Sequence, residues 1–495
     1  MSTKRFFQLI GVVTIVNVLS RFLGFVREAV IGYQFGTSSL ADSVILAYTI
    51  PNFVYSVLGG AVATAYISVY SKMDRDIHKQ RFHDVIFTYL LLFCVGLTGL
   101  FMILSKQVVQ LFFNGLHPSE VAMTSKLFFM MAPATLFLVF SMWFSGILNV
   151  RGQFYSASFA TLANNAFFIF IAVLLYPAIG VYAYGWGATV SAAIMVAVLV
   201  YYMYKSGVLC FRLRFHVSEK EYVLRMLKIA MPVLLGGATL QFYFFTQRMF
   251  ASQLDDGYVA ALNYASKLVQ LPQMILMTAA TTVIYPLLAK KTAEQDYEGI
   301  SQIFFKGLRL LIMFIVPVSV FVYVYAEPIV KIIFEYGSFT AQSTSMTAEM
   351  LKIFVIGMFA HAANLFVTRF FYAMEKSFAP VATGIVAVFG VNIALISFFI
   401  DQYGAASIAW GTTISALFQF FSLLVLGTRQ LKLRMDTGAL WGKLLLSLLI
   451  VTAVVWLSRL WIHTGYDLLD LCLAGCLFAV TAYALFRTAG LLSQG

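Results

Sequence analysis

The chain has 495 residues, of which 61% are hydrophobic and 11% charged, and its formal net charge is +12. A soluble globular protein carries about 25% charged residues, so the composition excludes this class and predicts a polytopic membrane protein. Lys and Arg fall mainly on alternate connections between apolar segments. That distribution is typical of membrane topology, so the positive charge does not indicate nucleic-acid binding.

The apolar segments predict an all-α fold with about fourteen transmembrane helices, because each has about 20 residues or more and can cross a hydrocarbon core of ~30 Å. The run after Lys4 and Arg5 is too long for a signal-peptide core, so the first helix is expected to be retained. The positive-inside rule places both termini in the cytoplasm. The predicted spans are 6–34, 40–70, 83–114, 122–149, 154–178, 181–204, 223–254, 258–289, 300–326, 343–373, 378–400, 404–428, 439–462 and 466–488.

An internal repeat divides the chain. The motif YGWGATVSA around Trp186 recurs as IAWGTTISA around Trp410, and Arg27 and Arg248 match at a similar offset. Either this similarity arises by chance between Gly- and Ala-rich segments, or two pseudo-symmetric six-helix lobes rock around a central site. The predicted organisation is an N-lobe at 1–205, a cytoplasmic linker at 206–222, a C-lobe at 223–430 and a C-terminal helix pair at 431–495.

A polar stripe runs along the first predicted helix. Arg27 lies at its edge, and a charge at the bilayer centre costs roughly 2.5–3.5 kcal/mol. The charged residues are therefore expected to face the bundle interior or a wet cavity. Spacings of three and four residues place the members of the stripe on one helical face; they are Thr14, Asn17, Arg21, Gly24 and Glu28.

Further polar groups are predicted inside the membrane. Asp42 and Asn52 share a face of the second helix, Lys267 lies in the eighth, and Arg248 lies near the end of the seventh. A cavity with surplus cations suits an anionic substrate, and guanidinium groups match phosphate or pyrophosphate oxygens in geometry and charge. In an alternative interpretation, the charges only hold the bundle together through the pairs Arg21–Glu28 and Arg27–Asp42, and Arg248 reaches the outer interface by snorkelling.

The sequence also resembles a known family. Residues 20–29 (SRFLGFVREA), 50–52 (IPN) and 263–268 (NYASKL) are similar to signature motifs of the MurJ (MviN) lipid II flippases of the MOP exporter superfamily. The resemblance covers the whole chain, including the two C-terminal helices. It implies alternating-access transport of undecaprenyl-pyrophosphate-linked peptidoglycan precursor from the inner to the outer leaflet of the bacterial cytoplasmic membrane, for cell-wall synthesis.

The resemblance also implies roles for single residues. Lys267 replaces an arginine, Tyr55 stands where a second-helix arginine is expected, and Ser266 stands where an acid is expected. The less charged cavity leaves open a related cargo, as in a Wzx-like flippase of another undecaprenyl-pyrophosphate-linked oligosaccharide. The implied substrate-binding residues are Arg21, Arg27, Lys267, Arg248, Asn52 and Tyr55, and the implied gating or ion-pair residues are Glu28 and Asp42.

Other functional classes find less support. The six histidines are scattered, the four cysteines lack metal-ligand spacing, and no enzyme motif occurs in its structural context. We therefore expect a transporter rather than an enzyme, with no cofactor, no metal and no nucleic-acid partner. An acid-rich MATE-type cation antiporter and a structural or signalling membrane protein are the alternatives. The expected partners are lipid II or a related saccharide lipid, membrane lipids and cell-wall synthesis proteins, around a monomer.

The predicted linker holds an alternation of basic and apolar residues from Phe211 to His216. Two interpretations fit this pattern. The segment is either an interfacial element on the anionic inner leaflet or a solvated connection between the lobes, and the sequence favours the solvated connection.

Overall fold

A computed structural model describes residues 3–73, 76–207, 211–216, 219–431, 433 and 438–491. Three basic residues on connections between the predicted spans, Arg75, Lys432 and Arg434, lie outside these ranges. The described residues are helical with turns and contain no strand. The chain forms two compact units, Met1–Val259 and Ala260–Gly495, and each is described by itself.

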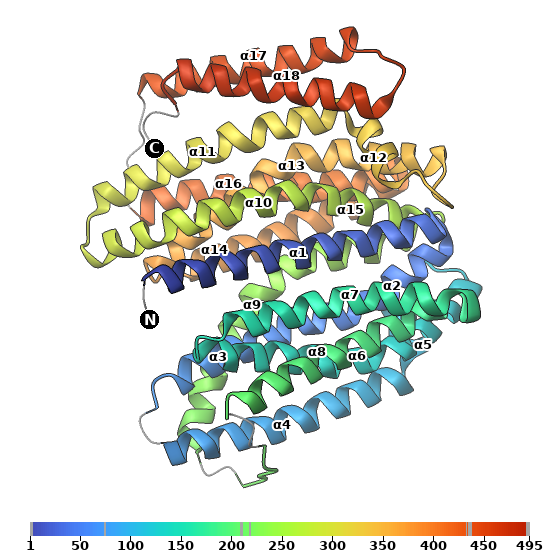
Figure 1. The fold of residues 1–495 in the computed structure, drawn as a ribbon, viewed down its shortest axis with the longest axis vertical. Coiled ribbons are helices and arrows are strands. Elements are labelled where there is room, and N and C mark those ends of the chain that lie inside the picture. The colour runs from blue at the N-terminus through green and yellow to red at the C-terminus, as the bar shows by residue number, and fades with distance from the viewer. Residues whose placement is uncertain are drawn as a thin grey trace. The chain divides into compact units, whose positions relative to one another are not determined.

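The first unit contains the helices up to the start of α10. Helices α6, α7 and α8 pack against one another, and α1 lies along α7 (Figure 1). The elements are α1 (Thr3–Phe35), α2 (Ser39–Val54), the π-helical turn η1 (Tyr55–Gly59), α3 (Gly60–Tyr70), α4 (Asp76–Ile103), α5 (Ser105–Phe112), α6 (Pro118–Val150), α7 (Phe154–Ile179), α8 (Tyr182–Lys205), α9 (Lys220–Ala251) and the beginning of α10 (Tyr258–Ala293).

The second unit holds the rest of α10 and all later helices. Helix α13 packs on α11 and α16, and the C-terminal pair α17 and α18 lies against α11 and α12 (Figure 1). The elements are α11 (Tyr297–Val324), α12 (Ala326–Phe334), α13 (Ala341–Ala373), α14 (Phe378–Ile385), the π-helical turn η2 (Val386–Asn392), α15 (Ile393–Tyr403), α16 (Ala405–Gln430), α17 (Ala439–Trp461) and α18 (Asp467–Thr488).

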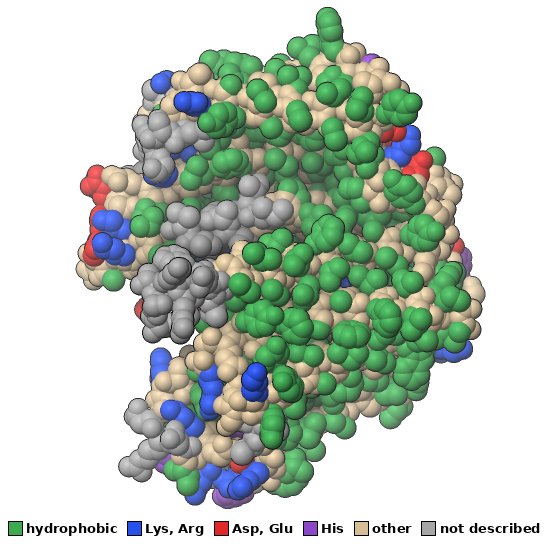
Figure 2. Space-filling view, viewed as in Figure 1, with side chains coloured by type: hydrophobic (Ala, Val, Ile, Leu, Met, Phe, Trp, Pro, Cys, Tyr) green, Lys and Arg blue, Asp and Glu red, His purple; other side chains and the backbone are tan. Residues whose placement is uncertain are grey.

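The helices have the length and composition of membrane spans. Among the described residues, 12 helical segments are long and apolar enough to cross a bilayer. Helices α1 and α10, with 33 and 36 residues, also exceed the length of a crossing. On the face shown in Figure 2, hydrophobic side chains cover most of the helical surface, while Lys and Arg gather near helix ends. The all-α, multi-pass fold is confirmed, and the predicted count of fourteen is approximate.

The second predicted span is one helical path with a change of geometry. Pro51 lies inside α2, where it cannot donate a backbone hydrogen bond, and η1 follows at Tyr55–Gly59. Such π-helical turns shift the side chains that follow them relative to a regular helix, and they are frequent at functional sites.

The repeated motif has the same local structure in both units. Gly180 ends α7 with φ +59°, and Gly404 ends α15 with φ +52°. Each glycine lies six residues before the tryptophan of the motif, Trp186 or Trp410. Because L side chains rarely adopt such a φ, the same turn is encoded twice by the same residue type, which supports the internal repeat.

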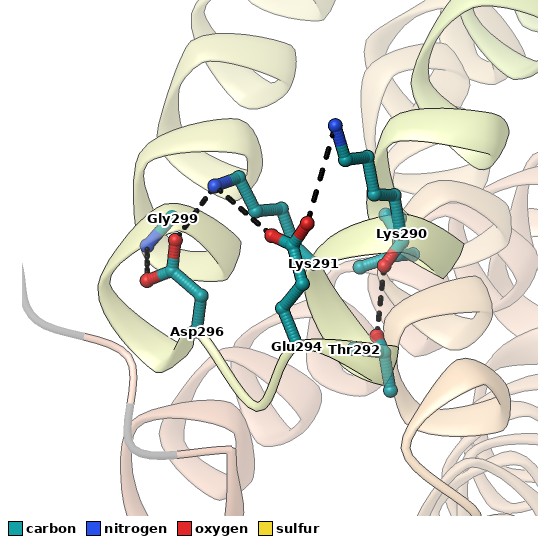
Figure 3. Close-up of polar contacts among 7 residues, drawn as sticks. Lys290, Lys291, Thr292, Glu294, Asp296 and Gly299 are labelled. Atoms are coloured by element: carbon teal, nitrogen blue, oxygen red, sulfur yellow. Dashed lines mark hydrogen bonds and ion pairs between the residues drawn. The ribbon is translucent and has the colours of Figure 1, made fainter.

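The turn between α10 and α11 is a small electrostatic cluster (Figure 3). The Lys291 Nζ donates to Asp296 Oδ2 at 2.8 Å and lies 3.4 Å from Glu294 Oε2. Asp296 also caps α11, because its Oδ1 accepts from the Gly299 N–H at 2.8 Å. The hydrogen bond from Lys291 lowers the pKa of the Asp296 carboxyl below its ordinary value, with a further contribution from the Gly299 amide.

Candidate functional site: an arginine–glutamate cluster in the first unit

The centre of the candidate site is an ion pair on α1. The Arg27 Nη2 donates to Glu28 Oε1 at 2.9 Å, and the two side chains are only 14% and 6% exposed. Burying either charge alone is costly, so the pair holds both side chains in place. The ion pair lies beside α2 and α7, because residues of these two helices make the other contacts of Arg27.

Two aromatic rings flank the guanidinium. The Arg27 Cζ lies 5.1 Å from the ring centre of Tyr48 on α2 and 5.0 Å from that of Phe168 on α7. Cation–π contacts of this kind orient a guanidinium plane. Neither ring was predicted. Tyr48 lies four residues before Asn52 and seven before Tyr55, so helical spacing places it on the same face as these two predicted site residues. Phe168 lies in an apolar helix, where no sequence pattern distinguishes it.

A second arginine joins the cluster from α9. Arg248 is half-buried and interacts electrostatically with Glu28, Arg27 and Tyr48. Two guanidinium groups and one carboxylate therefore influence one another electrostatically in this cluster. This arrangement can accept an anion, and a fork-shaped donor such as guanidinium favours phosphate oxygens.

Hydrogen bonds to α7 and α8 fix the position of α1. Asn165 Nδ2 donates to Ser20 O at 2.9 Å and to Ser20 Oγ at 3.2 Å. At the other end, the Tyr184 hydroxyl donates to Gln34 Oε1 at 2.9 Å. These contacts hold the helix that carries Arg27 on both sides of that residue, and the sequence patterns did not single out Asn165 or Gln34.

Asp42 connects the first turn of α2 to the residue that precedes α10. Its Oδ2 accepts from the Gly257 N–H at 2.7 Å, directly before α10 begins. Gly257 has φ +90°, and a Cβ added there would lie 2.4 Å from Thr37 O. The carboxylate of Asp42 and the carbonyl of Thr37 thus form a socket that only glycine fits.

The remaining predicted site residues lie in different surroundings. Arg21 occupies an exposed position on α1, and Asn52 is half-buried on α2. Tyr55 packs against Ala134, Leu138 and Ala192, so its ring has an apolar setting on one side. Lys267 is half-buried on α10 and belongs to the second unit.

Among the predicted site residues, Arg27 and Glu28 form an ion pair, and Arg248 interacts electrostatically with both. In the alternative interpretation, Arg27 pairs with Asp42. In the structure, Arg27 pairs with Glu28, and Asp42 accepts a hydrogen bond from Gly257. No group of three His, Cys, Asp or Glu residues that could hold a metal occurs in the described part of the chain.

The fold is shared with solved polytopic transporters of the MOP superfamily. An inward-facing multidrug resistance MATE family transporter of that superfamily matches 85% of this chain and 94% of its own, with a TM-score of 0.70 at 14% identity. A lipid II flippase MurJ in an inward closed conformation matches 96% of this chain and 99% of its own, with a TM-score of 0.83 at 20% identity.

The sequence comparisons identify the family. The family model described as lipid II flippase MurJ matches residues 31–469. A probable lipid II flippase MurJ from Buchnera aphidicola subsp. Acyrthosiphon pisum (strain APS) is 26% identical over 421 residues, which are 83% of this chain and 81% of the relative. The chain belongs to the lipid II flippase MurJ family, and the predicted resemblance is confirmed.

Proposed function

We propose that this protein moves lipid II, the undecaprenyl-pyrophosphate-linked peptidoglycan precursor, from the inner to the outer leaflet of the bacterial cytoplasmic membrane. The observation that carries the proposal is the family match over residues 31–469. The cluster of Arg27, Glu28 and Arg248 supports it, because the excess of guanidinium groups suits a pyrophosphate.

In the proposed cycle, the pyrophosphate replaces the Glu28 carboxylate as the partner of the Arg27 guanidinium. Arg248 supplies a second guanidinium for the pyrophosphate, and Lys267 supplies a further positive charge for binding it. Arg21, Asn52 and Tyr55 are proposed to contact the remainder of the head group, while Asp42 contributes to gating. Since Glu28 is an intramolecular competitor for Arg27, binding and release of the anion remain reversible.

Alternating access supplies the movement. The head group enters from the cytoplasmic side, the polyprenyl tail stays in lipid, and rocking of the two units opens the outer side. Any driving ligand or ion must bind the two states unequally. An inside-negative potential assists the outward movement of an anionic head by about 2.3 kcal/mol per charge per 100 mV. Both termini are proposed to be cytoplasmic, in a monomer that works beside cell-wall synthesis proteins.

The alternative cargo is another undecaprenyl-pyrophosphate-linked oligosaccharide. It is favoured by the two departures from the family pattern, Tyr55 and Ser266, which leave fewer charges for a pentapeptide-bearing head group. Tyr55 packs on an apolar cluster and Ser266 donates to Asn263 O at 2.9 Å, so neither residue replaces the expected charge.

The proposal is tested by complementation in a bacterium depleted of its own lipid II flippase. Surface-exposed lipid II is measured by its cleavage with an externally added lipid II-cleaving enzyme. Restored growth with restored cleavage supports the proposal. Normal membrane expression with neither result overturns it and favours the other oligosaccharide.

A further inference from the structure

Helix α9 is built into the core of the first unit. Its Met226 is a buried member of the hydrophobic cluster that also contains Phe82 and Trp143, and the Tyr222 ring lies 6.5 Å from the Phe82 ring. The helix packs against α2, η1, α3 and α4 (Figure 1). The sequence predicts α9 as the first helix of the C-lobe, so these contacts raise the question of which unit carries it.

The other end of α9 is held by aromatic contacts. The Phe53 ring on α2 lies 5.0 Å from Phe242 and 5.2 Å from Phe245, and the Phe112 ring on α5 lies 5.1 Å from Phe245. Offset and edge-on ring pairs at these distances are favourable. Contacts with the first unit therefore exist near both ends of α9.

Residues 211–216, which we call the strap, dock on α4 just before α9. The Phe211 ring stacks on Phe87 at 4.6 Å, on His83 at 5.3 Å and on Phe144 at 5.3 Å. Phe211 thus enters an aromatic slot formed by α4 and α6, while Arg212, Leu213, Phe215 and His216 of the same segment are exposed.

The backbone of the strap is also bound. The Arg214 N–H donates to Thr88 Oγ1 at 2.8 Å, and the Tyr89 hydroxyl donates to Phe215 O at 2.8 Å. Three residues before Tyr222, the Glu219 carboxylate lies 3.0 Å from His78 Nδ1. A segment outside regular secondary structure must find other partners for its backbone groups, and here side chains of α4 bind two of them.

We propose that α9 moves with the first unit during transport, that the strap is the clasp which fastens it to α4, and that the pivot lies beyond Gly257, which Asp42 holds to the first unit. The proposal rests on the alternating-access cycle described above. A pivot in the linker at 206–222 would instead have to withdraw Phe211 from its slot and Met226 from the core at each turnover. A pivot after α9 leaves both in place.

The first test fixes the strap to α4. In a cysteine-free background, Thr88→Cys with Arg214→Cys is joined by a short membrane-permeant bismaleimide, and lipid II exposure is measured before and after reaction. The matched control is Gln153→Cys with Ser206→Cys, since these side chains are hydrogen-bonded within the same unit at 2.6 Å. We expect both cross-linked proteins to keep transport within about a factor of two. A loss of about tenfold or more only in the strap pair would overturn the proposal.

The second test does not require transport. Spin labels on exposed positions of α4 and α9, Leu92 and Leu227, report the distance between the two helices in proteoliposomes with and without added lipid II. An unchanged distance distribution supports the proposal, whereas a shifted or second distance contradicts it. Failure of the wild-type protein to expose lipid II would reject the proposed function alone, because the helix distance is measured independently.

Discussion

Arg27 donates a 2.9 Å hydrogen bond to Glu28, the residue directly after it in the sequence. Neighbouring residues on an α-helix project about 100° apart, so the two long side chains must bend toward each other to pair. The pair is nearly buried, and Tyr48 and Phe168 flank the guanidinium. The Glu28 carboxylate therefore compensates the positive charge of Arg27 beside these aromatic rings.

Removing the charge of Glu28 is expected to destabilise the protein. Glu28→Gln leaves a buried guanidinium without its carboxylate, and breaking a buried ion pair costs about 3–5 kcal/mol. The double variant Arg27→Met with Glu28→Leu should recover most of that loss but not transport. Thermal unfolding in detergent, with complementation in parallel, measures both effects. Equal stability of Glu28→Gln and the wild type would show that the pair carries little of this energy.

Asp42 is expected to act mainly as a hydrogen-bond acceptor for Gly257. Asp42→Asn keeps an acceptor oxygen and should lower lipid II exposure only a few-fold, since charge-assisted hydrogen bonds are about twice as strong as neutral ones. Asp42→Ala leaves the buried Gly257 N–H without this acceptor, at about 1–3 kcal/mol, and should lose most transport. If both variants were equally inactive at normal expression, the charge itself would be the essential feature.

Lys267→Arg is expected to keep or raise transport. Arginine retains the positive charge at this half-buried position and adds the bidentate geometry that matches pyrophosphate. Lys267→Met, which keeps length but removes the charge, should lose transport. Complementation at matched membrane expression compares the two. An active Lys267→Met would remove this residue from the proposed substrate-binding set.

Asp296 predicts a pH dependence of stability. Its pKa in the folded protein is lowered below the ordinary 3.8, chiefly by Lys291. A lowered carboxyl pKa contributes stability that is complete above the ordinary value and is lost as pH falls through the folded pKa. The midpoint temperature of thermal unfolding should therefore decrease as the pH falls through this acidic range. Asp296→Asn should make that decrease smaller. Substitution of the exposed Asp401 by Asn is the control. A profile identical to wild type for Asp296→Asn would contradict the prediction.

Much of the fold follows from patterns local to the chain. The apolar runs predicted the membrane helices, and the recurring motif around Trp186 and Trp410 predicted a repeat that both units carry with the same glycine turn. The polar stripe also pointed to Arg27 and Glu28. Spacing alone could not show that these neighbours pair with each other, because helical periodicity places them on different sides.

The unpredicted features depend on contacts between distant segments. Phe168 lies in an apolar helix and becomes part of the site only because α7 packs beside α1. Phe211 lies in a basic, linker-like sequence, and its slot is formed by residues of α4 and α6. Tyr55 was expected to bind substrate from its position in a motif, whereas its apolar neighbours on α6 and α8 are not evident from the sequence.

The most direct test of the central claim is lipid II flipping by the purified protein in proteoliposomes, with Arg27→Ala as the paired variant and another undecaprenyl-pyrophosphate oligosaccharide as the competing cargo. The account predicts that the wild type moves lipid II and that Arg27→Ala, folded and equally reconstituted, loses at least about tenfold of the rate. Equal rates for Arg27→Ala and the wild type, or movement of the competing cargo without lipid II, would contradict it.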